Sequence, residues 1–165
     1  MEANEGDALF PRVAKLKDDM HTFDGSVQEL VINDEDGKPI HSSKHDRRFF
    51  EAAWMHKYKS KYYFSYSTGD THYLVYATGD SPLGPFTYQG RILEPVEGWT
   101  THHSIVEFNG KWYIPSMQPQ RPLTNYRYLF YHDTSLSGKN HLRCVKVREL
   151  VYDSDGKLGL AEPQT

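Results

Sequence analysis

The stretch Ala52–Gln89, AAWMHKYKSKYYFSYSTGDTHYLVYATGDSPLGPFTYQ, decides the fold class. Turn-forming Lys, Ser, Gly, Asp and Pro residues divide it into short runs rich in aromatic and β-branched residues, with little helical periodicity. These runs predict strands over Ala52–Tyr58, Tyr62–Ser67, Tyr73–Thr78 and Phe86–Gln89. Such short antiparallel strands joined by tight turns have the size of one β-propeller blade.

The same pattern returns further along the chain. A strand is predicted over Ser104–Phe108, followed by the hairpin turn Asn109-Gly110 and a return strand that starts at Lys111. Further strands are predicted over Leu129–His132 and Leu142–Val147. A β-meander repeated at about fifty residues predicts a solenoid or propeller. The segment 114–128, IPSMQPQRPLTNYRY, interrupts this second unit inside a strand. We expect this segment to be an insertion. It could be a long functional loop, but we favour the interpretation that it is translated sequence that splicing should remove.

The residues before Phe49 are less regular. Short strands are predicted over Pro11–Leu16 and Val27–Ile32, separated by turn signals. We therefore expect one all-β domain over 1–165, a partial β-propeller of about three blades of antiparallel four-stranded sheet. Its divisions are a remnant of an earlier blade at 1–48, a blade bearing Glu51 at 49–96, and a following blade at 97–156 that contains the insertion.

Composition excludes several classes of partner. The net charge is −3 with mixed signs, so no basic face predicts nucleic-acid binding. Cys144 is the single cysteine and cannot form an internal disulfide. No apolar run approaches the roughly twenty residues of a membrane span, and MEANEGDALF lacks the apolar core of a signal peptide. An aromatic content of 14% fits either a tyrosine-rich core or exposed rings that stack on sugars.

Glu51 is an acid at the start of an otherwise apolar strand. The repeat places Glu51 opposite Thr101, and Ala52 opposite His102. The first strand of each propeller blade lines the central channel, so Glu51 and His102 are expected to approach one channel. Burial beside Trp54 would raise the pKa of the Glu51 carboxyl, as a general acid requires. The alternative is a Glu51 ion pair with Arg47 or Arg48 at a blade edge.

Four histidines, His102, His103, His132 and His141, lie within the second unit. They allow a zinc site, but neither their spacing nor any cysteine partner supports one. Side chains alternate along a strand, so one of the adjacent pair must point away from the channel. We expect His103 to be that hydrogen-bonded structural residue. His72 and Trp99 could border the channel mouth, or serve only in turns and packing.

The motifs FFEAAWMHKY, KYYFSYSTGDTHYLVYATGDSPLGPFTYQGRIL, GWTTHHSIVEFNGKWY and HLRCVKVREL closely resemble the C-terminal half of glycoside hydrolase family 43. The resemblance runs from about Val13 to Gly156, apart from the insertion. It implies a five-bladed β-propeller and β-xylosidase or α-L-arabinofuranosidase activity on plant cell-wall glycans.

The resemblance implies roles for individual residues. Glu51 would be the general acid, His102 would lie beside a calcium ion or water cluster at the channel centre, and Arg143 would reach the substrate. Trp54, His72 and Trp99 are further candidates for substrate binding. No cofactor is required, although a structural calcium ion is allowed.

The family inverts configuration with an acid, a carboxylate base and a second aspartate that tunes the acid. The motifs of the two aspartates are absent from this sequence, where Asp18, Asp19 and Asp24 occupy turn-rich positions. We therefore expect a monomer that binds an oligosaccharide or polysaccharide and shows little or no hydrolysis by itself. Its N-terminal portion would be missing, which leaves its localisation open.

Two other functions are compatible with a β-propeller. A carbohydrate-binding module would keep the aromatic pocket without needing the base. An interaction propeller of the WD or kelch type would show a signature in every blade, and none is present.

Overall fold

The computed structural model describes residues 10–99, 101–108 and 126–159. Over these ranges the chain is all-β, as predicted, and forms no helix that could span a membrane. The strands are β1 (Arg12–Val13), β2 (Gln28–Glu29), β3 (Ile32–Asn33), β4 (Glu51–Tyr58), β5 (Lys61–Ser67), β6 (Leu74–Gly79), β7 (Phe86–Leu93), β8 (His103–Phe108), β9 (Tyr126–Asp133), β10 (Cys144–Tyr152) and β11 (Leu158–Gly159).

The first large sheet contains the predicted meander. Strands β4 to β7 pair antiparallel in chain order, and β3 adds to β7 as a parallel fifth strand. The β4–β5 hairpin turns at Lys59 and Ser60, with Lys59 in the left-handed region at a φ of 52°. The four predicted strands of this unit are thus confirmed, and β7 continues beyond its expected end to Leu93.

The N-terminal segment covers one face of this sheet. Strands β1 and β2 form a two-stranded sheet of their own, so residues 10–48 do not build a four-stranded blade. Apolar side chains of this segment, Leu30, Ile32 and Ile40, pack on those of the sheet. The sheet residues of this cluster are Phe64, Tyr66, Val75, Ala77, Phe86 and Tyr88. Each large side chain buried in this way contributes roughly 1.5–3 kcal/mol.

The second sheet has the order β11-β10-β9-β8, all antiparallel. Strand β8 pairs with β9, while the expected hairpin turn Asn109-Gly110 and the return strand from Lys111 lie outside the described residues. The segment 114–125 also lies outside them, and its interpretation as an insertion stays a prediction. Residues Tyr126–Tyr128, the end of the expected insertion, instead belong to β9: all three pair with β8, and Arg127 and Tyr128 also pair with β10.

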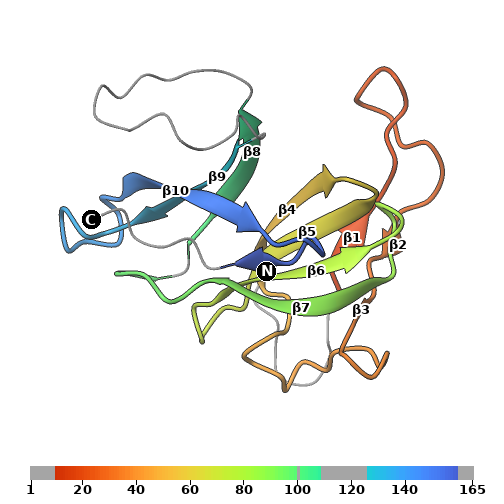
Figure 1. Ribbon diagram of the computed structural model, residues 1–165. Coiled ribbons are helices and arrows are strands. Elements are labelled where there is room, and N and C mark those ends of the chain that lie inside the picture. The colour runs from red at the N-terminus through yellow and green to blue at the C-terminus, as the bar shows by residue number, and fades with distance from the viewer. Residues whose placement is uncertain (1–9, 100, 109–125, 160–165) are drawn as a thin grey trace.

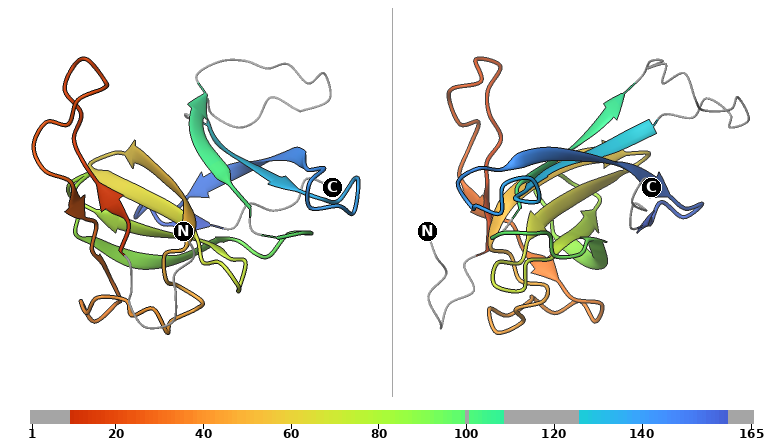
Figure 2. Two further views of the ribbon diagram at one scale, coloured as in Figure 1. Left: turned by 180° about the vertical axis from the view of Figure 1, so that it is seen from behind. Right: turned by 90° about the vertical axis from the view of Figure 1, so that its left-hand side faces the viewer.

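The two large sheets face one another across an apolar seam (Figures 1 and 2). The seam cluster combines residues of both, namely Tyr63, Leu74, Tyr76, Ile92, Leu93, Ile105, Leu129, Tyr131, Leu150 and Leu158. The indole Nε1 of Trp54 on β4 donates a hydrogen bond across it to the carbonyl of Ile105 on β8, at 3.1 Å. This packing brings the starts of β4 and β8 together, and the candidate site lies there.

Candidate active site

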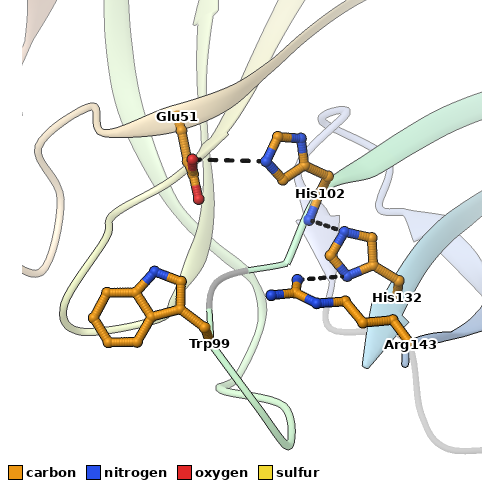
Figure 3. A pocket seen from close by; sticks show the side chains of 5 residues that line it. All are labelled: Glu51, Trp99, His102, His132 and Arg143. Atoms are coloured by element: carbon orange, nitrogen blue, oxygen red, sulfur yellow. Dashed lines mark hydrogen bonds and ion pairs between the residues drawn. The ribbon is translucent and has the colours of Figure 1, made fainter. Parts of the chain in front are cut away.

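A β-bulge at the start of β4 aims Glu51. Glu51 pairs with Ser67 and Trp54 with Ser65, so β4 carries one more residue than β5 between these pairs. The bulge includes Ala52, whose φ of 60° lies in the left-handed region that a residue with a Cβ seldom adopts. This local turn of the backbone directs the Glu51 side chain into an open cavity (Figure 3).

Glu51 meets His102 from the neighbouring sheet. Oε2 of Glu51 lies 3.7 Å from Nε2 of His102, a distance at which an ion pair forms when the imidazole is protonated. The two arginines that might instead have paired with Glu51 are engaged elsewhere, Arg47 with Glu35 and Asp46, and Arg48 with Asp70. The side chain of Glu51 is 34% exposed, so the carboxylate keeps access to solvent.

His103 turns the other way, as strand alternation predicted. Its Nε2 lies 2.7 Å from Oγ of Ser65 on β5 inside the seam, which confirms the structural role expected for it. Burial is the main reason that the pKa of His103 falls to about 3, with smaller contributions from His102 and His56. His103 is therefore neutral, and it lies against Ser65 in the seam, not among the residues that line the cavity.

His132 on β9 extends the site. Its Nε2 lies 3.2 Å from the backbone N–H of His102, and its Nδ1 lies 3.0 Å from Nη1 of Arg143. Both neighbours are donors, and a neutral imidazole has one acceptor nitrogen, so the tautomer decides which contact is a full hydrogen bond. Burial and the charge of Arg143 hold the pKa of His132 below its usual value, which favours this neutral form.

Trp99 provides an aromatic wall. It lies in the connection between the sheets, where its backbone N–H donates to Oδ1 of Asn140 at 3.1 Å, and it remains 52% exposed. The ring of His72 packs against it edge-on, with ring centroids 4.9 Å apart and planes at 90°. His72 has a φ of 58° in the turn between β5 and β6, so this turn sets the position of the ring.

The cavity has a volume of about 520 Å³ and is lined by Glu51, Trp99, His102, His132 and Arg143. Figure 3 shows their side chains around its open centre. It combines a carboxyl group, an arginine, two imidazoles and an indole face, which suits a neutral polar ligand with an apolar ring face, such as a sugar.

The structure brings four of the predicted site residues, Glu51, Trp99, His102 and Arg143, into this cavity. Trp54 is not among them, because its ring packs in the seam and its Nε1 donates to Ile105. His72 lies behind Trp99 and does not line the cavity. Neither is retained as a direct ligand of a substrate.

His132 is the residue that sequence reasoning did not assign to this site. Its position follows from the β8–β9 register, in which Tyr131 lies opposite His103. The sequence reasoning expected Leu129–His132 to continue the return strand that starts at Lys111, next to Ser104–Phe108, but it weighed His132 for a zinc site alone and did not carry the register through to this cavity. The signal that could have revealed its place is the strand YLFYH, once its register against β8 is fixed.

The cavity does not by itself form a calcium site. Calcium takes six to eight oxygen ligands, whereas Glu51 is the one carboxylate among the residues of the described ranges that line the cavity. Over the described ranges, no group of three or more His, Cys, Asp or Glu side chains could hold a metal ion. His102 could offer at most one nitrogen ligand.

No family model matches the chain, but individual relatives do. The xylosidase/arabinosidase 43A of Humicola insolens is 62% identical over 159 residues, which are 95% of this chain and 44% of that protein. The xylosidase/arabinosidase of Bacteroides ovatus is 57% identical over 155 residues, 93% of this chain and 43% of its own length.

Solved structures are also similar to this chain, both in sequence and in backbone. A family 43 β-xylosidase/α-arabinofuranosidase from a compost metagenome, solved with xylotriose in a calcium-free form, has a TM-score of 0.84 at 56% identity. The match covers 99% of this chain and 46% of that one. The family 43 enzyme of Xanthomonas citri, complexed with xylose, has a TM-score of 0.83 at 46% identity and is covered to 45%.

The chain spans less than half the length of these relatives. Their agreement with it in sequence and in backbone confirms the predicted partial propeller, while its division into blades stays a prediction. The chain belongs to glycoside hydrolase family 43, and it corresponds to the C-terminal portion of the family's members.

Proposed function

We propose that this chain is the acid-bearing part of a glycoside hydrolase that cleaves O-glycosyl bonds in xylan- or arabinan-type oligosaccharides. One observation carries the proposal: among the described residues that line the cavity, Glu51 is the single carboxylate, and a bulge aims it there. Support comes from the relatives, which are named xylosidases and arabinosidases, and from neighbours solved with xylose and xylotriose.

The proposed chemistry is inversion. Glu51 gives its proton to the glycosidic oxygen as the bond from that oxygen to the anomeric carbon breaks. A water molecule attacks this carbon from the opposite face and passes its proton to a carboxylate base. The two carboxyl groups of an inverting enzyme stand roughly 6.5–9.5 Å apart to leave room for that water.

The base must come from outside the described residues, because their cavity contains one carboxylate. Arg143 would donate hydrogen bonds to sugar hydroxyls, and Trp99 would stack on the apolar face of a ring. By itself the chain would bind the sugar and hold the acid, without a group that activates water. We propose no required cofactor, and we leave a structural calcium ion to ligands beyond this cavity.

The test compares binding with turnover. Xylotriose and arabino-oligosaccharides are titrated into the chain by calorimetry or NMR, and aryl β-xyloside and aryl α-L-arabinofuranoside are offered as substrates. We expect weak binding, reduced about tenfold by Arg143→Ala, and turnover close to background. Turnover by the chain alone that Glu51→Gln abolishes would show that its site is already complete.

A second candidate is a non-catalytic carbohydrate-binding module. The exposed ring of Trp99 beside a cavity with one carboxylate favours it. Joining this chain to the remaining portion of the Humicola insolens relative separates the two functions. A hydrolase gains turnover that Glu51→Gln lowers by about 10²–10⁴-fold, whereas a module binds sugar and gains none.

A further inference from the structure

A buried hydroxyl ends the ladder between β8 and β9 beside the cavity. The last backbone pair at this end joins His103 to Tyr131, and the next residue of β9 is His132. The backbone of His132 is bound by the side chain of Thr101, a residue only 2% exposed. Oγ1 of Thr101 donates to the His132 carbonyl at 2.6 Å and accepts from the His132 N–H at 3.2 Å. Thr101 therefore takes the place of a backbone partner for His132.

The single proton of this hydroxyl goes to His132. The carbonyl of His102 lies 3.2 Å from Oγ1 of Thr101 and is a second acceptor. A hydroxyl donates one proton, and the shorter contact to the His132 carbonyl takes it. One side chain thus satisfies both the donor and the acceptor of the His132 backbone. A valine at position 101 would have nearly the same shape and could satisfy neither.

The ring of His132 connects two other residues of the cavity. Because the ladder has ended, the N–H of His102 points to this ring and lies 3.2 Å from its Nε2. Nη1 of Arg143 lies 3.0 Å from Nδ1, on the other side of the ring (Figure 3). The rings of His102 and His132 are nearly parallel, with centroids 5.8 Å apart and planes at 20°. The placement of His132 therefore bears on both neighbours.

We propose that Thr101 is a positioning residue, which fixes the backbone of His132 and, through its ring, the placement of His102 and Arg143 at the cavity. Thr101 is not among the described residues that line the cavity, so it acts on a ligand through these neighbours alone. Two donors face the ring of His132, and a neutral imidazole accepts at one nitrogen only. A small displacement of the ring therefore changes which donor is satisfied. The expected effect on sugar binding rests on the proposed function, whereas the effect on the ring does not.

Nitrogen NMR of the imidazole rings tests the placement of His132 without a ligand. The two ring-nitrogen signals of His132 are assigned by their loss in His132→Gln. At a fixed neutral pH, we expect Thr101→Val to shift these signals and Thr101→Ser, which keeps the hydroxyl, to leave them in place. Tyr63→Phe is the matched control, because its buried hydroxyl also donates to a carbonyl at 2.6 Å, that of Gly156, outside the cavity. We expect Tyr63→Phe to leave the His132 signals unchanged.

Xylotriose titration tests whether the placement matters for binding. We expect Thr101→Val to lower the affinity by about threefold to tenfold, the loss of about one hydrogen bond, and Thr101→Ser to restore it. In a His132→Gln background, Thr101→Val should change the affinity by less than about twofold, because the ring through which Thr101 acts is gone. Tyr63→Phe should bind xylotriose as the original chain does.

Three results would overturn the inference: His132 signals that Thr101→Val leaves in place, signals that Thr101→Ser shifts as far as valine does, or losses of affinity in Thr101→Val and His132→Gln that add. If Thr101→Val does not fold, amide exchange in the original chain and the ring-nitrogen signals of His102 in His132→Gln replace it. Fast exchange of the His132 N–H, or His102 signals that His132→Gln does not shift, would then overturn the inference. Shifted His132 signals in Thr101→Val, together with no xylotriose binding by the original chain, would uphold the positioning role and count against the proposed function alone.

Discussion

Oε2 of Glu51 lies 3.7 Å from Nε2 of His102, although β4, which begins with Glu51, and β8, which follows His102, belong to different sheets and are separated in sequence by β5, β6 and β7. Neither residue is placed by its own strand alone. The bulge at Ala52 aims Glu51, and the hydrogen bond between His103 and Ser65 anchors the start of β8. The site therefore depends on the seam between the sheets, and on the turns and ion pairs that hold the seam together.

The turn at Gly69 supports the strand that bears Glu51. A Cβ on Gly69 would lie 2.7 Å from Cγ of Phe50, the residue before Glu51, and the backbone there has a φ of +84°. We expect Gly69→Ala to combine a backbone cost of about 1–2 kcal/mol with an overlap cost of about 1–3 kcal/mol. Urea unfolding measures the sum, and xylotriose titration reports the displacement of Glu51.

Gly138→Ala is the matched control. Its φ of +65° imposes the same kind of backbone cost, but no atom lies within 4 Å of the added Cβ. We expect it to lose about 1–2 kcal/mol and to bind xylotriose as the original chain does. Equal destabilisation by the two variants would mean that the overlap with Phe50 carries no energy.

The ion pair of Arg127 and Glu107 stabilises the seam. Nη2 of Arg127 donates to Oε2 of Glu107 at 2.7 Å and to the carbonyl of Lys57 on β4 at 2.9 Å. Arg127 is buried, whereas Glu107 is about one-third exposed. We expect Glu107→Gln to cost about 1–2 kcal/mol, less than the 3–5 kcal/mol of a fully buried pair, because solvent screens the carboxylate.

Arg127→Met should cost more than Glu107→Gln in the same urea titration, since it also removes the packing of the guanidinium against the rings of Tyr58 and Tyr152. A smaller loss of free energy of unfolding for Arg127→Met than for Glu107→Gln would show that burying the guanidinium in the seam is itself unfavourable and that its packing contributes little.

The sequence predicted the meander because each strand of β4–β7 is short, aromatic and bounded by turn residues. It also predicted that Glu51 and His102 approach one channel, since the repeat alone aligns their strands. It did not predict the position of His132, because the segment 114–128 interrupts the strand expected between Tyr113 and Leu129 and leaves the register of His132 against β8 open. It did not separate Trp54 from the cavity either, because a bulge shifts the alternation of side chains between Glu51 and Trp54.

Stability should fall as the solution becomes mildly acidic. Burial lowers the pKa of both His56 and His103 to about 3. The ordinary pKa of about 6.5 returns on unfolding, so below that pH the unfolded chain takes up protons that the folded chain excludes. Between pH 6.5 and the folded pKa, each buried histidine therefore lowers the free energy of unfolding by about 1.4 kcal/mol for every pH unit of acidification. Above pH 6.5 the histidine is neutral in both states, and the free energy of unfolding no longer depends on its protonation.

The comparison of His103→Gln with His141→Gln isolates this effect. Gln stays neutral and can still hydrogen-bond Ser65, so His103→Gln should flatten the dependence between pH 6.5 and 5, where most carboxylates remain ionised. His141 is exposed, and His141→Gln should leave the slope unchanged. Urea midpoints at several pH values provide the measurement, and parallel slopes for all three proteins would contradict a buried neutral His103.

The packing of His72 on Trp99 should control the wall of the cavity. The test replaces His72 with Asn, which tolerates the left-handed backbone at this position and removes the ring. Without the edge-on imidazole, Trp99 should become more accessible to acrylamide, and xylotriose affinity should fall by about threefold to tenfold, in keeping with about 0.5–1.5 kcal/mol for an aromatic pair. The emission of Trp99 is obtained as the difference between each protein and its Trp99→Phe counterpart.

His72→Ala separates the ring from the backbone in this test. It should lower the affinity for xylotriose as much as His72→Asn does, because both variants remove the imidazole. It should also lower the free energy of unfolding by about 1 kcal/mol more, since Ala tolerates the left-handed region less well than Asn. If His72→Asn left both quenching and affinity unchanged, Trp99 would be held by its hydrogen bond to Asn140 alone.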